Sequence, residues 1–147
     1  MTIPVLVARQ RTVKLSLGYC MRITEVPAGL PVEHDYRELF DENTIGVPRT
    51  MGSVWFHVYG APAFTSCDGL AVFAADLTSV QCDNIEVEPT HRNKGLATAM
   101  YKIASYIFDA PVVPSSTQLF GGQLFWARKT QIYCRSVSGL LSPGYTI

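Results

Sequence analysis

The segment from Ile85 to Phe108 constrains the fold of this chain more than any other part of its sequence. It begins with a short apolar strand, passes through a turn that contains Arg92, Lys94 and Gly95, and continues with apolar residues at helical spacing. A helix that begins directly after such a turn presents unpaired backbone N–H groups and the positive end of its dipole. Together with the basic side chains, these groups predict an anion-binding site.

The composition indicates one globular domain that spans residues 1–147, because the chain is long enough for a single core and 48% of it is hydrophobic. The formal net charge is zero, which argues against a general nucleic-acid binder. Residues 1–87 carry six basic and ten acidic side chains, whereas residues 88–147 carry six basic and two acidic ones. A basic half suits an anionic ligand and an acidic half a cationic one, but chance in a small sample explains the asymmetry equally well.

The four cysteines are widely spaced and form no Cys-x-x-Cys pair or Cys/His cluster, so we expect no metal site. A reduced, cytoplasmic protein is the simpler interpretation of this cysteine usage. The N-terminus lacks the pattern of a secretory signal, and no apolar run reaches the length of a membrane span, so we expect no association with membranes.

Apolar patterning predicts several strands before the first long helix, and then alternating helices and strands. The helix starts near Leu96, continues through Met100, Ile103 and Ile107 on one face, and ends at residues 109–111. This order predicts an α/β (α+β) fold with layers around one sheet. The other expected elements are extended segments at 5–7 and 13–23, helices at 31–42 and 118–129, and strands at 53–60, 70–76, 80–88, 111–114 and 132–139.

The spacing of Val87, Pro89, Arg92, Gly95 and Ala97 fits the pattern V-x-P-x-x-[Q/R]-x-x-G-x-[G/A]. This pattern resembles motif A of the GNAT superfamily of acyl-CoA N-acyltransferases, and the match covers residues 82–110. The alternative is a strand–turn–helix unit without a ligand-binding role, which also needs small residues in its turn. The resemblance implies a single mixed, mostly antiparallel sheet flanked by helices, with a V-shaped opening between central strands that holds acyl-CoA.

The same resemblance implies that acetyl-CoA is the co-substrate and that no metal takes part. The turn would hold the coenzyme A pyrophosphate on its backbone N–H groups, and the strand before it would pair with pantetheine. A backbone N–H near Val87 would stabilise the developing oxyanion. The implied binding residues are Ile85, Val87, Arg92, Asn93, Lys94, Gly95, Leu96 and Ala97. For Lys94, a solvated surface lysine is an equally good interpretation.

Direct transfer from the thioester requires a base that deprotonates the attacking amine. The candidates are Asp83, Glu86 and Glu88, and each is individually at least as well explained as an exposed surface carboxylate. By strand alternation, Asp83 shares a face with Ile85 and Val87, while the two glutamates point to the other face. His91 is best interpreted as an exposed turn residue. His57, on an expected strand, fits a core histidine or a substrate contact.

Many GNAT members carry a tyrosine on the helix after the fifth strand, but this chain has Trp126 there, and an indole N–H is no acid for a thiolate. Ser115, Ser116 and Tyr133 are substitute candidates, and Ser115 and Ser116 fit helix caps equally well. Coenzyme A would otherwise leave as the unaided thiolate. Trp126 itself is expected in the core or in a pocket wall.

These residues support two hypotheses. The first is an N-acetyltransferase that acts on a primary amine, such as a protein lysine, a protein N-terminus or a small-molecule amine. The second is a non-catalytic acyl-CoA-binding or protein-interaction module on the same scaffold. The acidic residues near 33–42 favour a cationic acceptor. A homodimer is compatible with the short C-terminal region, whose last strand a partner subunit would complete.

Overall fold

The structure is a computed structural model that describes residues 9–26, 52–75, 78–114, 125–127 and 129–147. The expected helix at 31–42, the extended segment at 5–7, most of the expected helix at 118–129 and the candidates Ser115 and Ser116 lie outside these residues. Within the described part of the chain, no helix is long and apolar enough to cross a membrane.

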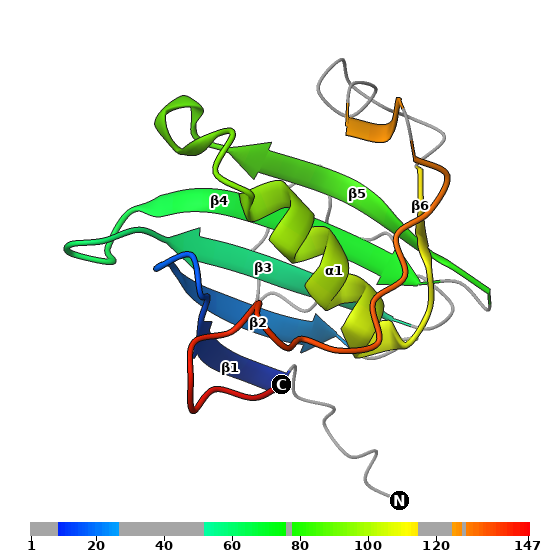
Figure 1. Cartoon of the computed structure of the whole chain (residues 1–147), viewed down its shortest axis with the longest axis horizontal. Coiled ribbons are helices and arrows are strands. Elements are labelled where there is room, and N and C mark those ends of the chain that lie inside the picture. The colour runs from blue at the N-terminus through cyan, green and yellow to red at the C-terminus, as the bar shows by residue number, and fades with distance from the viewer. Residues whose placement is uncertain (1–8, 27–51, 76–77, 115–124, 128) are drawn as a thin grey trace, which may run out of the picture.

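Six strands form one mixed sheet in which the spatial order follows the sequence order, β1-β2-β3-β4-β5-β6 (Figure 1). Neighbours from β1 to β5 are antiparallel, and β6 joins β5 in parallel. The sheet therefore agrees with the expected mixed, mostly antiparallel class. The strands are β1 (Arg9–Lys14), β2 (Cys20–Val26), β3 (Ser53–Tyr59), β4 (Cys67–Ala75), β5 (Val80–Val87) and β6 (Val112–Val113).

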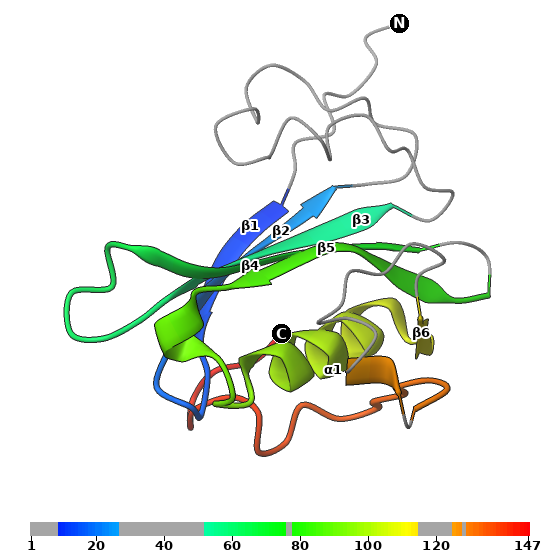
Figure 2. The same cartoon turned by 90° about the horizontal axis from the view of Figure 1, so that it is seen from above.

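Helix α1 (Leu96–Phe108) packs across one face of the sheet, and it makes the crossover between β5 and the parallel strand β6 (Figure 2). Its buried stripe confirms the helix predicted from apolar spacing. The helix ends at Asp109, which adopts a left-handed conformation with φ of 48°. The core between helix and sheet includes Met21, Ile23, Val54, Phe56, Phe73, Leu96, Met100 and Ile103.

The C-terminal region differs from the strand expected at 132–139. Only Ile132 pairs there, in a single antiparallel bridge to Val112. The chain then runs past α1 back to the start of the sheet, where Leu141 forms a bridge to Leu15 (Figure 1). The Ser105 hydroxyl accepts a hydrogen bond from the Cys134 N–H at 2.9 Å and so ties this C-terminal strap to α1. A hydrogen bond to the Ser105 side chain thus holds this segment, in place of the backbone pairing that its β propensity predicted.

Candidate functional site

The turn between β5 and α1 has a backbone in which the sign of φ alternates. It contains one short 3-10 helix, η2 (Pro89–His91), followed by Asn93 with φ of 61° and Gly95 with φ of 87°. Lys94, between them, is not among the residues with positive φ. In a backbone nest, residues of alternating φ sign turn successive N–H groups toward one concavity that suits an anion, and the positive φ values of Asn93 and Gly95 are compatible with that form. We call residues 92–95 the nest.

The start of α1 adds further donors to this concavity. The first intrahelical hydrogen bond runs from the Ala99 N–H to the Gly95 carbonyl, so the N–H groups of residues 96–98 have no partner within the helix. No side chain caps this end of the helix among the described residues. Leu96 is buried, whereas Arg92, Asn93, Lys94 and Gly95 are exposed.

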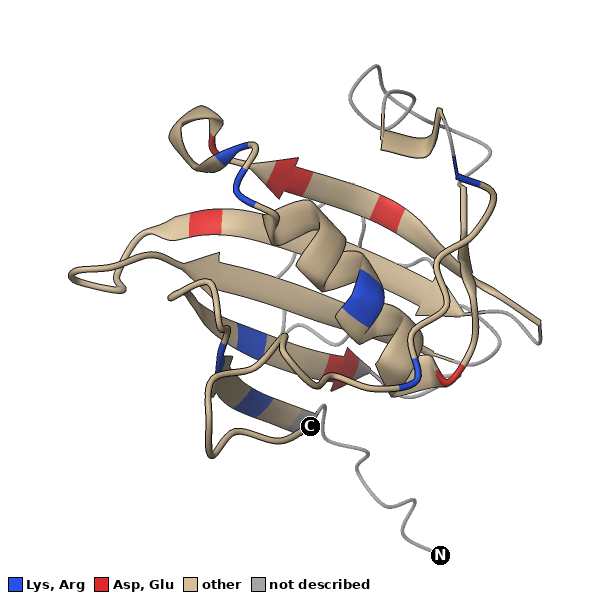
Figure 3. Cartoon of the chain, viewed as in Figure 1, with Lys and Arg blue, Asp and Glu red and all other residues tan. Residues whose placement is uncertain are grey.

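Two basic residues precede these donors in the turn, and they are marked in blue in Figure 3. The Arg92 Nε donates a hydrogen bond to the Val87 carbonyl at 2.8 Å, which folds the side chain against the end of β5. The exposed Lys94 lies one residue before Gly95. The predicted cofactor-binding residues of the turn are therefore adjacent in space. Their geometry is compatible with a bound anion, and anion binding stays a prediction.

The candidate carboxylates on β5 do not converge. A bulge interrupts the pairing with β4 at Asp83, because Asn84 faces Val72 and Cys82 faces Phe73, with Asp83 left over between them. Cys82 and Ile85 consequently both contribute to the core beneath α1 although they are three residues apart. Strict strand alternation, on which the predicted parity of Asp83 rested, therefore fails at this residue.

The two glutamates lie elsewhere. Glu86 pairs with Leu70 on the face opposite α1 and is exposed. Glu88 is also exposed, lies beyond the end of β5, and has its backbone N–H bound to the Asp68 carbonyl at 2.9 Å. Ile85 and Val87 pack on the core. His57 is 7% exposed, which makes it a buried residue on β3.

Strand β5 has two unequal edges. It pairs with β4 from Val80 to Val87, but its pairing with β6 covers only Val80 and Gln81. In the described residues, the rest of that edge has no strand beside it. Strand addition by an extended ligand, as the resemblance implies for pantetheine, would use the backbone groups of this edge.

Trp126 is buried, as expected, and it packs edge-on against Tyr101 of α1 with ring centroids 5.4 Å apart. The Tyr101 hydroxyl is hydrogen-bonded to the Trp126 indole and to the Cys82 thiol. Burial, followed by the proximity of Cys82, raises the pKa of Tyr101. Burial likewise raises the pKa of Cys82 to about 12. Tyr133, a substitute acid in the sequence-based list, instead donates to the Asp109 carboxylate at the far end of α1.

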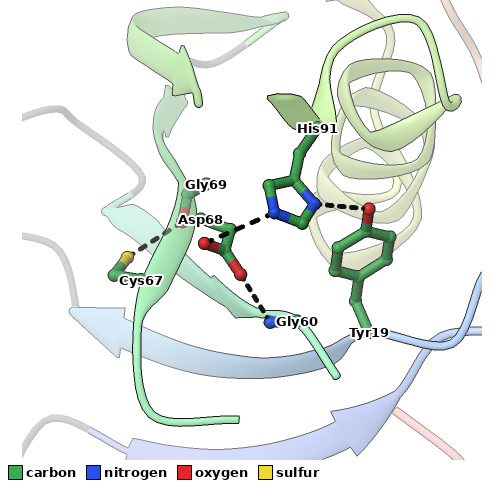
Figure 4. A network of polar contacts seen from close by, with 6 residues as sticks. All are labelled: Tyr19, Gly60, Cys67, Asp68, Gly69 and His91. Atoms are coloured by element: carbon green, nitrogen blue, oxygen red, sulfur yellow. Dashed lines mark hydrogen bonds and ion pairs between the residues drawn. The ribbon is translucent and has the colours of Figure 1, made fainter. Parts of the chain in front are cut away.

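A polar network that the sequence did not reveal lies beside the turn (Figure 4). The Tyr19 hydroxyl and His91 Nδ1 are 2.8 Å apart, and His91 Nε2 lies 3.6 Å from Asp68 Oδ1. Asp68 Oδ2 accepts the Gly60 N–H at 2.8 Å. His91 is therefore half-buried with both ring nitrogens engaged, and its interpretation as an exposed turn residue is wrong.

In the described part of the chain, no group of three His, Cys, Asp or Glu side chains is arranged to hold a metal ion. Comparison of the chain with protein families, with characterised proteins and with solved structures found no match.

Proposed function

We propose that the protein is a GNAT-type N-acetyltransferase that moves an acetyl group from acetyl-CoA to a primary amine. The observation that carries this proposal is the backbone nest at Asn93 and Gly95, continued by the open N–H groups at the start of α1. A pyrophosphate supplies the negative charge and the acceptor oxygens that backbone N–H donors and basic side chains bind. Arg92 and Lys94 supply the positive charge beside it.

The short pairing between β5 and β6, which covers only Val80 and Gln81, is compatible with the same proposal. Pantetheine would lie along the β5 edge beyond Gln81 as an added strand, with its thioester near the bulge at Asp83. The unshared pair of the amine nitrogen then attacks the carbonyl carbon, the new C–N bond forms and the C–S bond breaks. The amine proton passes to a base, and the coenzyme A thiolate leaves and takes its proton from solvent.

Among the carboxylates, Asp83 and Glu86 are placed best to act as the base, directly or through water. Asp83 occupies the bulge, and Glu86 lies on the exposed part of the opposite face. Glu88 lies beyond the strand end. We expect Asp83→Asn or Glu86→Gln to lower kcat about a hundredfold or more, while Glu88→Gln serves as the matched control. Equal activity of all three variants would show that none of these carboxylates is the general base.

Calorimetric titration with coenzyme A tests the binding half of the proposal. The double change Arg92→Glu with Gly95→Glu places two negative charges at the nest, so we expect it to abolish binding. Arg135→Glu is the matched charge reversal, because Arg135 stacks on Tyr133 away from the turn. A double variant that kept wild-type affinity would show that the pyrophosphate does not bind here.

A second candidate function is an acyl-CoA-binding module without turnover. It is favoured by Trp126, a buried residue that stands where the family pattern has a tyrosine and that offers no acid. Incubation with acetyl-CoA and a panel of amines and basic proteins, read by mass spectrometry, separates the two candidates. Acetylated products support the enzyme, whereas tight binding with no product supports the module.

A further inference from the structure

We propose that Tyr19, Asp68 and His91 are positioning residues that hold the β5–α1 turn in its anion-binding shape. This inference rests on the proposed function, because it assigns a role at the same site. The three residues come from separate parts of the fold: Tyr19 from the β1–β2 turn, Asp68 from the start of β4, and His91 from the β5–α1 turn itself (Figure 4). We refer to them below as the Tyr19–Asp68–His91 latch.

Asp68 holds the turn at two points. Its backbone carbonyl accepts the Glu88 N–H at 2.9 Å, and its carboxylate faces His91 Nε2 at 3.6 Å. Its second oxygen accepts the Gly60 N–H, so the carboxylate has a fixed orientation. The turn is therefore fastened to β4 both before and within η2, and Tyr19 fastens the other side of the His91 ring.

The space for the latch depends on Gly60. A Cβ atom at this position would lie 2.6 Å from Asp68 Oδ2 and 3.3 Å from ring carbons of both His91 and Tyr19. Packing this close around three polar side chains leaves few alternative rotamers. The latch is thus a fitted contact and differs from a loose surface ion pair, whose energy is commonly negligible.

The latch is adjacent to a backbone conformation that needs support. Asn93, two residues after His91, has a positive φ, which costs a non-glycine residue energy unless the surroundings enforce it. The ring of His91 fixes the chain directly before this residue. Loss of the latch would let the turn relax, and the nest N–H groups would no longer converge on one point.

The latch lies away from the thioester position proposed near Asp83. Five residues of extended chain separate Asp83 from Glu88, which corresponds to roughly 16 Å. These side chains therefore affect the affinity for the anion and do not affect the rate of the chemical step. The expected kinetic signature is a raised KM for acetyl-CoA with kcat unchanged.

The test uses Tyr19→Phe, Asp68→Asn and His91→Gln, with titration of coenzyme A and of inorganic pyrophosphate into each variant. Tyr133→Phe is the matched control, because it removes a tyrosine hydroxyl that bonds a carboxylate at the opposite end of α1. We expect each latch variant to raise both dissociation constants and KM about tenfold, with kcat within about twofold of wild type. Tyr133→Phe should match the wild type in all of these.

Latch variants that bind coenzyme A as wild type does would overturn this inference and leave the proposed function intact. Wild-type protein that binds neither coenzyme A nor pyrophosphate would overturn both. A fall in kcat as large as the rise in KM would also contradict a positioning role. Tyr19→Phe is the variant least able to disturb folding, since it deletes one oxygen, and it decides the result if Asp68→Asn does not fold.

Discussion

Gly95→Ala isolates the conformational demand of the turn. Gly95 has φ of 87°, and an added Cβ would meet only the Leu17 side chain, at 3.8 Å, which is an ordinary contact. The substitution therefore introduces no clash, and its cost is the left-handed backbone, about 1–2 kcal/mol for an L-residue. Reduced freedom of the unfolded chain offsets about 0.4–1 kcal/mol of this. We expect a net loss of about 1 kcal/mol.

Gly139→Ala is a matched control for this prediction. Gly139 has φ of 82°, and nothing lies within 4 Å of its Cβ position, so it carries the same backbone cost on the C-terminal strap, outside the β5–α1 turn. Urea unfolding should show a similar loss for both variants, equivalent to a Tm shift of about 2–4 °C. Calorimetry with coenzyme A should show affinity lowered about tenfold in Gly95→Ala only, because relaxation at this position moves the nest donors.

The stability of Gly95→Ala and its affinity for coenzyme A can each contradict the prediction. If Gly95→Ala is as stable as wild type, the backbone at that position does not carry the strain inferred from φ. If Gly95→Ala is destabilised like Gly139→Ala yet binds coenzyme A with wild-type affinity, the turn shape does not determine anion binding. Loss of affinity in both variants would mean that general destabilisation accounts for the effect.

Three further predictions concern the frame around the site. Ser105→Ala removes a buried hydroxyl with two backbone hydrogen bonds of 2.9 Å, so urea unfolding should show a loss of about 2 kcal/mol; a loss below about 0.5 kcal/mol would contradict the anchoring role. Because burial raises the pKa of Cys82 from 9.0 to about 12, the folded state suppresses its ionisation. The ionisation of Cys82 should leave the free energy of unfolding unchanged below about pH 9 and lower it by about 1 kcal/mol per pH unit above pH 9. Urea unfolding of wild type and Cys82→Ala at several pH values checks this, because the variant should lose this pH dependence. Gly60→Ala should displace the Asp68 carboxylate and destabilise the protein by about 1–3 kcal/mol, measured by thermal unfolding. Unchanged stability would show that the side chains around Gly60 can rearrange without cost.

The elements with strong periodic signals were predictable from the sequence. Helix α1 begins at the predicted Leu96 and ends at Phe108, directly before the predicted end at residues 109–111, because an apolar stripe, a preceding glycine and a following proline all act locally. The strands at 53–59 and 80–87 likewise follow alternating or continuous apolar runs. These features depend on neighbours in sequence, which is the information that a single chain contains.

The features that were missed depend on distant partners. The bulge at Asp83 is a property of the β4–β5 pair, so no pattern within β5 indicates it. His91 was interpreted wrongly because its partners, Tyr19 in the β1–β2 turn and Asp68 on β4, are distant in sequence. The strap near Cys134 carries strand-like residues, yet its hydrogen bonds go to a serine on α1.

The sheet irregularity and the turn are parts of one arrangement along β5. An extra residue such as Asp83 bends and twists a strand, and here it lies two residues after the last pair that β5 forms with β6. The same strand then ends in the turn that holds Asn93 and Gly95. Asp83 and Glu88, at the two ends of this stretch, lie roughly 16 Å apart along the strand. An anion bound at the turn would therefore reach the bulge only through a long extended arm, which coenzyme A has and a compact anion lacks.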